Sequence, residues 1–138
     1  MSTQSMYAEL FRALSDDREF SRRRIAHDSG LYHSKLIRIL DKGQNADFDD
    51  IVRIGKAVGA DPMRAAIAVL LLKDPSAYFS QTIRIASELL TALTIDLSKL
   101  DERLFEGFVD QEISGLASLL LNAVKPALER RDRRITFL

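Results

Sequence analysis

Apolar residues recur at steps of three and four positions along almost the whole 138-residue chain. This spacing places them on one face of an α-helix, whereas a half-buried strand would show strict alternation, which no stretch clearly does. Only six glycines and three prolines interrupt the pattern. Because 46% of the residues are apolar, such helices can bury a substantial core. The sequence therefore predicts an all-α fold.

Five helices are predicted in the N-terminal part, over about residues 4–14, 22–28, 33–40, 47–58 and from Pro62 onward. Ser21 is a good N-cap, and Asp61 followed by Pro62 is a second start signal. Gly30 and Gly59 stand where helices commonly end in a left-handed residue. The first helix should bury Met6, Leu10, Phe11 and Leu14, and the fourth Phe48, Ile51, Val52, Ile54, Ala57 and Val58.

Asp74 and Pro75 repeat the start signal, which predicts a domain boundary there, with one domain over 1–73 and a helical segment over 74–138. A heptad rhythm of apolar residues runs from Phe79 to Leu104 and indicates a long helix, interrupted near Ser98. A second long helix is expected from about Asp101, with Pro126 kinking or fraying its last turns. These two helices carry more leucine than a hairpin can hide. We therefore expect them to form a homodimer or to fold back on the first domain.

Composition excludes several classes of protein. The chain has no cysteine, so it has no disulfide and no thiolate metal site, as is typical of a reducing compartment. Its two histidines are too few for a zinc site, and we expect no metal and no cofactor. No phosphate loop, catalytic triad or metal-binding pair is present, so an enzyme is not predicted. The longest apolar run, at 65–72, is too short to span a membrane, and no signal peptide precedes it, which favours a cytoplasmic protein.

The segment from Ser21 to Asn45 predicts two short helices joined by a tight turn at Gly30, which is a helix-turn-helix. The small Ala26 lets the second helix of the pair approach the first closely. The space behind the two helices is filled by Ile25, Leu31, Leu36 and Ile39. The remaining face of the second helix then points outward, and a helix has the right width for the major groove of B-DNA.

This segment, SRRRIAHDSGLYHSKLIRIL followed by DFDDIVRIGKAVGADP, resembles the helix-turn-helix domain of the Cro/lambda-repressor type over about residues 6–72. The features that match are the Ile-Ala pair, the glycine four residues after Ala26, the apolar Leu36 and Ile39, and the fourth helix with its terminal glycine. One feature departs from the family: the loop at Asp41-Lys42-Gly43 is one residue longer. No family resemblance extends over residues 74–138.

The resemblance implies a site for double-stranded DNA on the third helix and around it. Residues implied to read bases are His33, Ser34, Lys35, Ile37 and Arg38, and residues implied to contact phosphates are Arg22, Arg23, Tyr32, Lys42, Gln44 and Asn45. A guanidinium can bridge the O6 and N7 atoms of guanine, which makes Arg38 the strongest candidate for a specific contact, and Ile37 could contact a thymine methyl.

Charge supports the same site independently of the resemblance. Between Arg18 and Lys42 seven basic residues face three acidic ones, whereas the whole chain carries 20 of each. Positive charge concentrated in one segment of a neutral protein is typical of a sequence-specific DNA-binding protein.

The sequence therefore predicts a transcription regulator of bacterial or phage type, most simply a repressor that blocks polymerase. Two alternatives stay open. One is an antitoxin whose C-terminal helices bind a toxin while the first domain regulates its own gene. The other is a protein-interaction module that keeps the helix-turn-helix fold without binding DNA.

Overall fold

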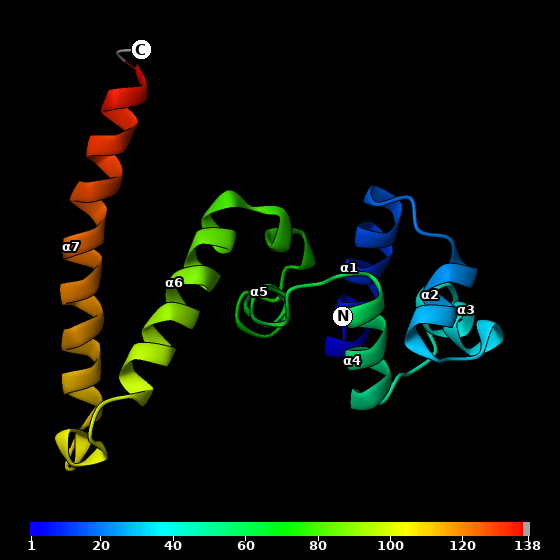
Figure 1. The fold of residues 1–138 in the computed structure, drawn as a ribbon, viewed down its shortest axis with the longest axis horizontal. Helices are drawn as coiled ribbons and strands as arrows, with labels where there is room; N and C mark the ends of the chain where they lie inside the picture. Colours follow the sequence, from blue (N-terminus) through cyan, green and yellow to red (C-terminus); the bar gives the residue numbers. More distant parts are fainter. Residues whose placement is uncertain (137–138) are drawn as a thin grey trace. The chain divides into compact units, whose positions relative to one another are not determined.

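In the computed structural model of the chain, residues 1–136 are described, with side chains up to Arg131. Every regular element among them is helical, which confirms the all-α prediction (Figure 1). The elements are α1 (Thr3–Asp17), α2 (Arg22–Ser29), α3 (His33–Lys42), α4 (Phe48–Ala57), α5 (Pro62–Ala66), a π-helical η1 (Ile67–Leu71), the 3₁₀ helix η2 (Pro75–Phe79), α6 (Gln81–Ser98), the 3₁₀ helix η3 (Glu102–Phe105) and α7 (Asp110–Thr136).

Contacts divide the chain into two units, Met1–Asp96 and Leu97–Leu138. The division falls inside α6, later than the boundary predicted near Asp74. The segment after Asp74 belongs to the first unit because Tyr78 is buried there and its hydroxyl accepts the Asp61 N–H at 2.9 Å. Tyr78 thereby ties η2 to the start of α5.

The core of the first unit is built mainly by α1 to α4. Within it α1 packs on α3 and α4, and α2 packs on α3 and α4; α1 and α4 lie side by side in Figure 1. All four side chains predicted for the α1 face are buried, and of the side chains predicted behind α2 and α3, Ile25, Leu36 and Ile39 are buried while Leu31 is half-buried. The buried apolar side chains of these four helices are Met6, Leu10, Phe11, Leu14, Ile25, Ala26, Leu36, Ile39, Leu40 and Ile54.

The helix ends follow the predicted signals. The Ser21 Oγ accepts the Arg24 N–H at 3.1 Å, and Gly30 ends α2 in a left-handed conformation with φ 72°. Asp47 caps α4 through the Asp50 N–H, and the Asp50 carboxylate accepts the Asp47 N–H in return. This capping box satisfies two backbone donors that a helix start leaves unpaired.

One residue of the predicted core is exposed. Phe48 was expected on the buried face of α4, but 82% of its surface is accessible. It occupies the first position of the helix, at the edge of the buried stripe, so the core formed by Ile54 and Val58 does not reach it.

The helices of the C-terminal part differ from the predicted ones mainly in where they start. The start signal at Asp74 and Pro75 opens the short η2, and the long helix of the heptad pattern begins at Gln81, two residues after Phe79, and ends at Ser98 as predicted. The second long helix starts at Asp110 rather than near Asp101, because Gly107 takes a left-handed conformation with φ 73° that separates it from η3. The last turns do not fray at Pro126, since α7 continues to Thr136. A proline removes only one backbone donor, and the turns beyond it keep theirs.

Candidate nucleic-acid interface

Helix α3 has a buried side and an exposed side. Leu36, Ile39 and Leu40 are buried in the core of the first unit. The opposite side, which we call the α3 outer face, consists of His33, Ser34, Ile37 and Arg38; all are exposed except Ile37, which is half-buried. Ser34 and Arg38 are four residues apart and therefore stand one above the other on the same side. These four residues face away from the core, as the sequence predicts.

Three cations on or beside α3 are exposed and unpaired. Arg23 on α2, and Arg38 and Lys42 on α3, have no carboxylate within ion-pair distance among the residues that the structure describes. By contrast, Arg24 lies 3.9 Å from the centre of the Phe20 ring and 3.7 Å from the Asp28 carboxylate. The unpaired three can therefore accept an external anion without first breaking an internal ion pair.

Lys35 points away from the α3 outer face. Its Nζ lies 3.3 Å from the carboxylate of Asp50, which is only 5% exposed and belongs to the capping box of α4. This ion pair links α3 to the start of α4. The resemblance implies that Lys35 reads bases, but in the structure Lys35 instead holds α3 and α4 together.

Arg22 is likewise engaged inside the protein. Its Nε and Nη2 donate to the two carboxylate oxygens of Asp41, each at 3.0 Å, and its Nη1 donates to the buried Ser15 Oγ at 2.8 Å. These bonds join α1, α2 and α3. The hydrogen bond from Arg22 lowers the pKa of Asp41, and the same bond raises the pKa of Arg22. Arg22 would have to break these bonds before it could bind a phosphate, so it is the weakest of the predicted phosphate contacts.

The remaining phosphate candidates lie at the two ends of α3. Tyr32 is 84% exposed at the N-cap and its side chain does not cap the helix, so among the described residues no side chain takes the first backbone donors of α3. Gly43 ends α3 with φ 70°, and the Gln44 N–H bonds to the Arg38 carbonyl at 2.9 Å. Gln44 and Asn45 are exposed in the loop that follows.

Arg53 on α4 was not among the sequence candidates. A Cβ added at Gly30 would lie 3.4 Å from its Nη1, so this guanidinium reaches the turn between α2 and α3. Its Nε donates to the Asp49 carboxylate at 2.8 Å, and half of the side chain is exposed. No local sequence signal could identify it, because its place depends on how α2 packs on α4.

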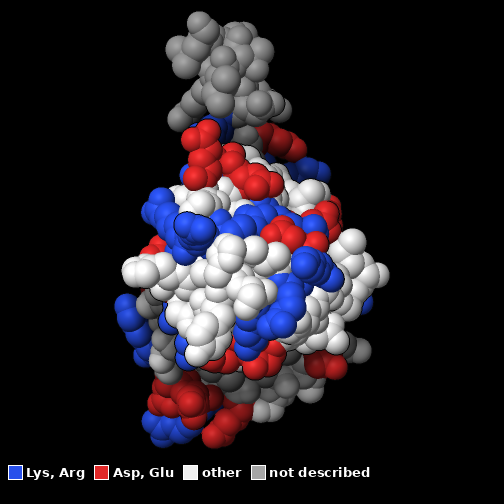
Figure 2. All heavy atoms as spheres, turned by 90° about the vertical axis from the view of Figure 1, so that its right-hand side faces the viewer, with Lys and Arg blue, Asp and Glu red and all other residues white. Residues whose placement is uncertain are grey.

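Basic side chains gather on one face of the first unit. Figure 2 looks onto the side of the first unit where α2 and α3 lie, and Lys and Arg side chains gather across the middle of this view. Acidic groups lie mainly above and below them. This face of the first unit therefore carries a concentration of basic side chains.

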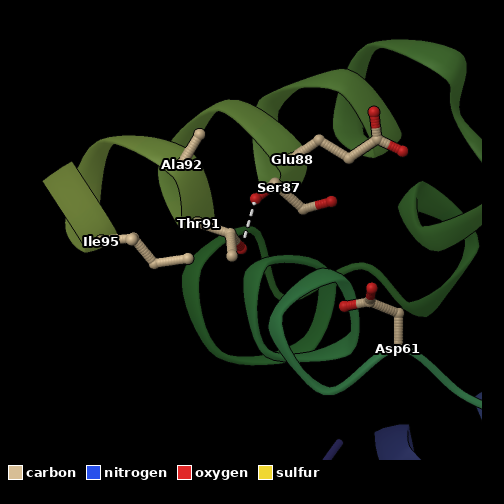
Figure 3. Close-up of a pocket in the computed structure, with 6 residues that line it drawn as sticks. All are labelled: Asp61, Ser87, Glu88, Thr91, Ala92 and Ile95. Atoms are coloured by element: carbon tan, nitrogen blue, oxygen red, sulfur yellow. Dashed lines mark hydrogen bonds between the residues drawn. The ribbon is translucent and has the colours of Figure 1, made fainter.

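Two hollows elsewhere in the first unit are poorer candidates. One, of about 300 Å³, lies between α6 and Asp61 (Figure 3). The Thr91 and Ser87 hydroxyls beside it donate to carbonyls of their own helix at 2.9 and 2.8 Å, and Asp61 caps α5. The other, of about 290 Å³, is an apolar groove lined by side chains of α1, α4, α5 and η1.

Neither a metal site nor a membrane segment is found in the described part of the chain. No group of three or more His, Cys, Asp or Glu side chains there could hold a metal ion. None of its helices combines the length and apolar character needed to cross a membrane.

Comparison of the chain with protein-family models, with curated proteins and with solved structures gave no match. What the candidate interface can do is therefore argued from its own residues.

Proposed function

We propose that this protein is a sequence-specific DNA-binding transcription regulator of the helix-turn-helix type, with α3 as the recognition helix. The observation that carries the proposal is the unpaired, exposed Arg38 on the side of α3 that faces away from the core. An α-helix with one buried side and one bare polar side can enter the major groove, where arginine recognises guanine.

Three residues of the α3 outer face have complementary chemistry for base edges. The Arg38 guanidinium can donate two hydrogen bonds to guanine, and the Ser34 hydroxyl can donate or accept. Ile37, half-buried on the same outer face, offers an apolar contact for a thymine methyl. His33 stands one position before Ser34 at the start of the helix.

Phosphate contacts would come from both sides of α3. Arg23 and Lys42 supply unpaired positive charge, and Tyr32, Gln44 and Asn45 supply exposed polar groups. The uncapped N-terminus of α3 adds backbone N–H donors and the positive end of the helix dipole. Such contacts fix the register of the recognition helix without reading sequence.

The test is selection of bound sites from random DNA, followed by measurement of Arg38→Ala and Arg23→Ala on the selected site and on unrelated DNA. Arg38→Ala should weaken binding to the selected site by about 1–3 kcal/mol and relax base choice at one position. Arg23→Ala should weaken binding to both DNAs alike. Arg84→Ala, which removes the same charge from α6, is the control and should change neither.

Equal weakening of both DNAs by Arg38→Ala would contradict base reading by α3. No DNA binding even at low salt would favour the second candidate function, a protein-interaction module that keeps the helix-turn-helix fold without binding DNA. That candidate is supported by the exposed apolar side chains of the C-terminal unit, which include Leu104, Leu116 and Leu119.

A further inference from the structure

Helix α7 contains a long segment without charge. No Lys, Arg, Asp or Glu occurs between Ile113 and Val124, more than three turns of helix, so this segment lacks the charged face of an ordinary surface helix. Large apolar side chains within it are nevertheless half-exposed or more, at 55% for Ile113, 49% for Leu120 and 65% for Leu119.

The C-terminal unit does not cover these side chains itself. From Leu97 to Arg131, where its side chains are described, every residue is exposed except Val124, which is half-buried. A unit without a core cannot offset the conformational entropy that its folding costs. The apolar surface of α7 therefore needs an occupant.

The apolar residues follow the spacing of a helix that packs on another helix. They recur at steps of three and four, as in a coiled-coil seam, and we call them the α7 stripe: Ile113, Leu116, Leu120, Ala123 and Ala127. The opposite side of the helix carries the small or polar residues Ser114, Gly115, Ser118 and Asn122, with the exposed Leu121 at its edge.

Charges at the two ends of α7 indicate which occupant fits. The first turn is acidic, with Asp110 and Glu112, whereas residues 125–131 are basic on balance, with Lys125, Arg130 and Arg131 against Glu129. Glu112 and Arg130 are five turns apart at 3.6 residues per turn, so both stand on the same flank of the α7 stripe. A second α7 laid antiparallel brings each Glu112 to the Arg130 of the other copy, whereas a parallel pair brings like charges together.

We propose that α7 pairs antiparallel with the α7 of a second copy of this chain, through the α7 stripe, with Glu112 and Arg130 at the rim. The pair is isologous, with a two-fold axis that passes near Leu121, midway between Glu112 and Arg130. This pairing depends only on α7 and holds whether or not α3 reads DNA, so its test needs no DNA.

The first test is the mass of the full-length protein in solution, as a function of concentration, for a matched pair of variants. Leu120→Asp, on the α7 stripe, should shift the protein from dimer to monomer. Ser118→Asp places the same charge on the opposite side of the same helix and should leave the dimer intact. A monomeric parent protein, or equal effects of the two variants, would overturn the proposal.

The second test fixes the orientation, and the absence of native cysteine makes it direct. Glu112→Cys and Arg130→Cys are prepared as separate proteins and mixed under oxidising conditions. An antiparallel pair should give the mixed disulfide and little self-linked product, because the like positions of an antiparallel pair stand about 27 Å apart. Self-linked Glu112→Cys or Arg130→Cys in the absence of the other variant would contradict the antiparallel arrangement.

Discussion

Three adjacent arginines on α2 have three different environments. Arg22 donates to Asp41 and to Ser15, Arg24 lies over the Phe20 ring, and Arg23 is exposed without a carboxylate partner in the described part of the chain. The run of arginines is therefore not a uniform basic patch. One of the three links helices, one packs on an aromatic ring, and one is available to an external anion.

Asp41→Asn should lower the free energy of unfolding by about 1 kcal/mol at neutral pH, since it weakens a bidentate, partly exposed ion pair. The measurement is urea unfolding of the first unit's helices, and Asp17→Asn on the exposed end of α1 is the control. Unchanged stability in Asp41→Asn would show that Arg22 does not hold the three helices together.

The same pair predicts a pH dependence. The pKa of Asp41 is lowered in the folded protein, so its contribution is present above the unfolded pKa of about 4 and is lost as the pH falls through the folded value. The stability difference between the parent and Asp41→Asn should accordingly be constant from neutral pH to about 5 and should shrink below about 4. A difference that grows on acidification would contradict the assigned cause.

The sequence could place these residues on helices but could not name their partners. Arg22 and Lys35 are identified as DNA contacts by position in the motif alone. Their carboxylate partners, Asp41 and Asp50, lie on other elements, and only the packing of α2, α3 and α4 brings each pair together. Arg38, whose environment is set by α3 itself, was placed correctly on the exposed side.

Among the helices, α4 has both ends secured by side chains. The capping box of Asp47 and Asp50 secures its start, and Arg18 secures its end by donating to the Val58 and Gly59 carbonyls at 2.6 and 3.0 Å. Because α4 packs on α1 and α2, the fixed ends of α4 also fix the support on which the α2–α3 turn rests.

Gly59→Ala should destabilise the protein more than Gly43→Ala. Both glycines are left-handed, with φ 72° and 70°, so an alanine costs about 1–2 kcal/mol at either position. Only at Gly59 does the new Cβ also collide with the Arg18 guanidinium, while at Gly43 it meets nothing. Thermal unfolding of both variants checks this order, and equal losses would mean that Arg18 does not hold the end of α4.

Helix boundaries were predictable where a local signal sets them. Ser21, Gly30, Asp61 and Gly59 act as expected because a cap is a property of a few neighbouring residues. The start of α7 was placed too early because the left-handed Gly107 interrupts an otherwise continuous apolar pattern. Phe48 was misplaced because periodicity does not show where a neighbouring core stops.

For the whole molecule, the net charge of zero does not show that unpaired cations lie together on α2 and α3. Twenty basic and twenty acidic residues cancel, yet the unpaired Arg23, Arg38 and Lys42 belong to one pair of helices. A second copy joined through α7 would give one particle two such cationic surfaces, and two linked contacts bind more tightly than one.

The most direct test of the central claim is DNA affinity as a function of salt concentration. If Arg23 and Lys42 each neutralise a phosphate, log K should fall against log salt with a slope of about −2 for each bound copy. Arg23→Ala should reduce the steepness by about 1, whereas Arg84→Ala should leave it unchanged. A slope near zero, with binding unaffected by Arg23→Ala, would contradict the DNA-binding role of α2 and α3.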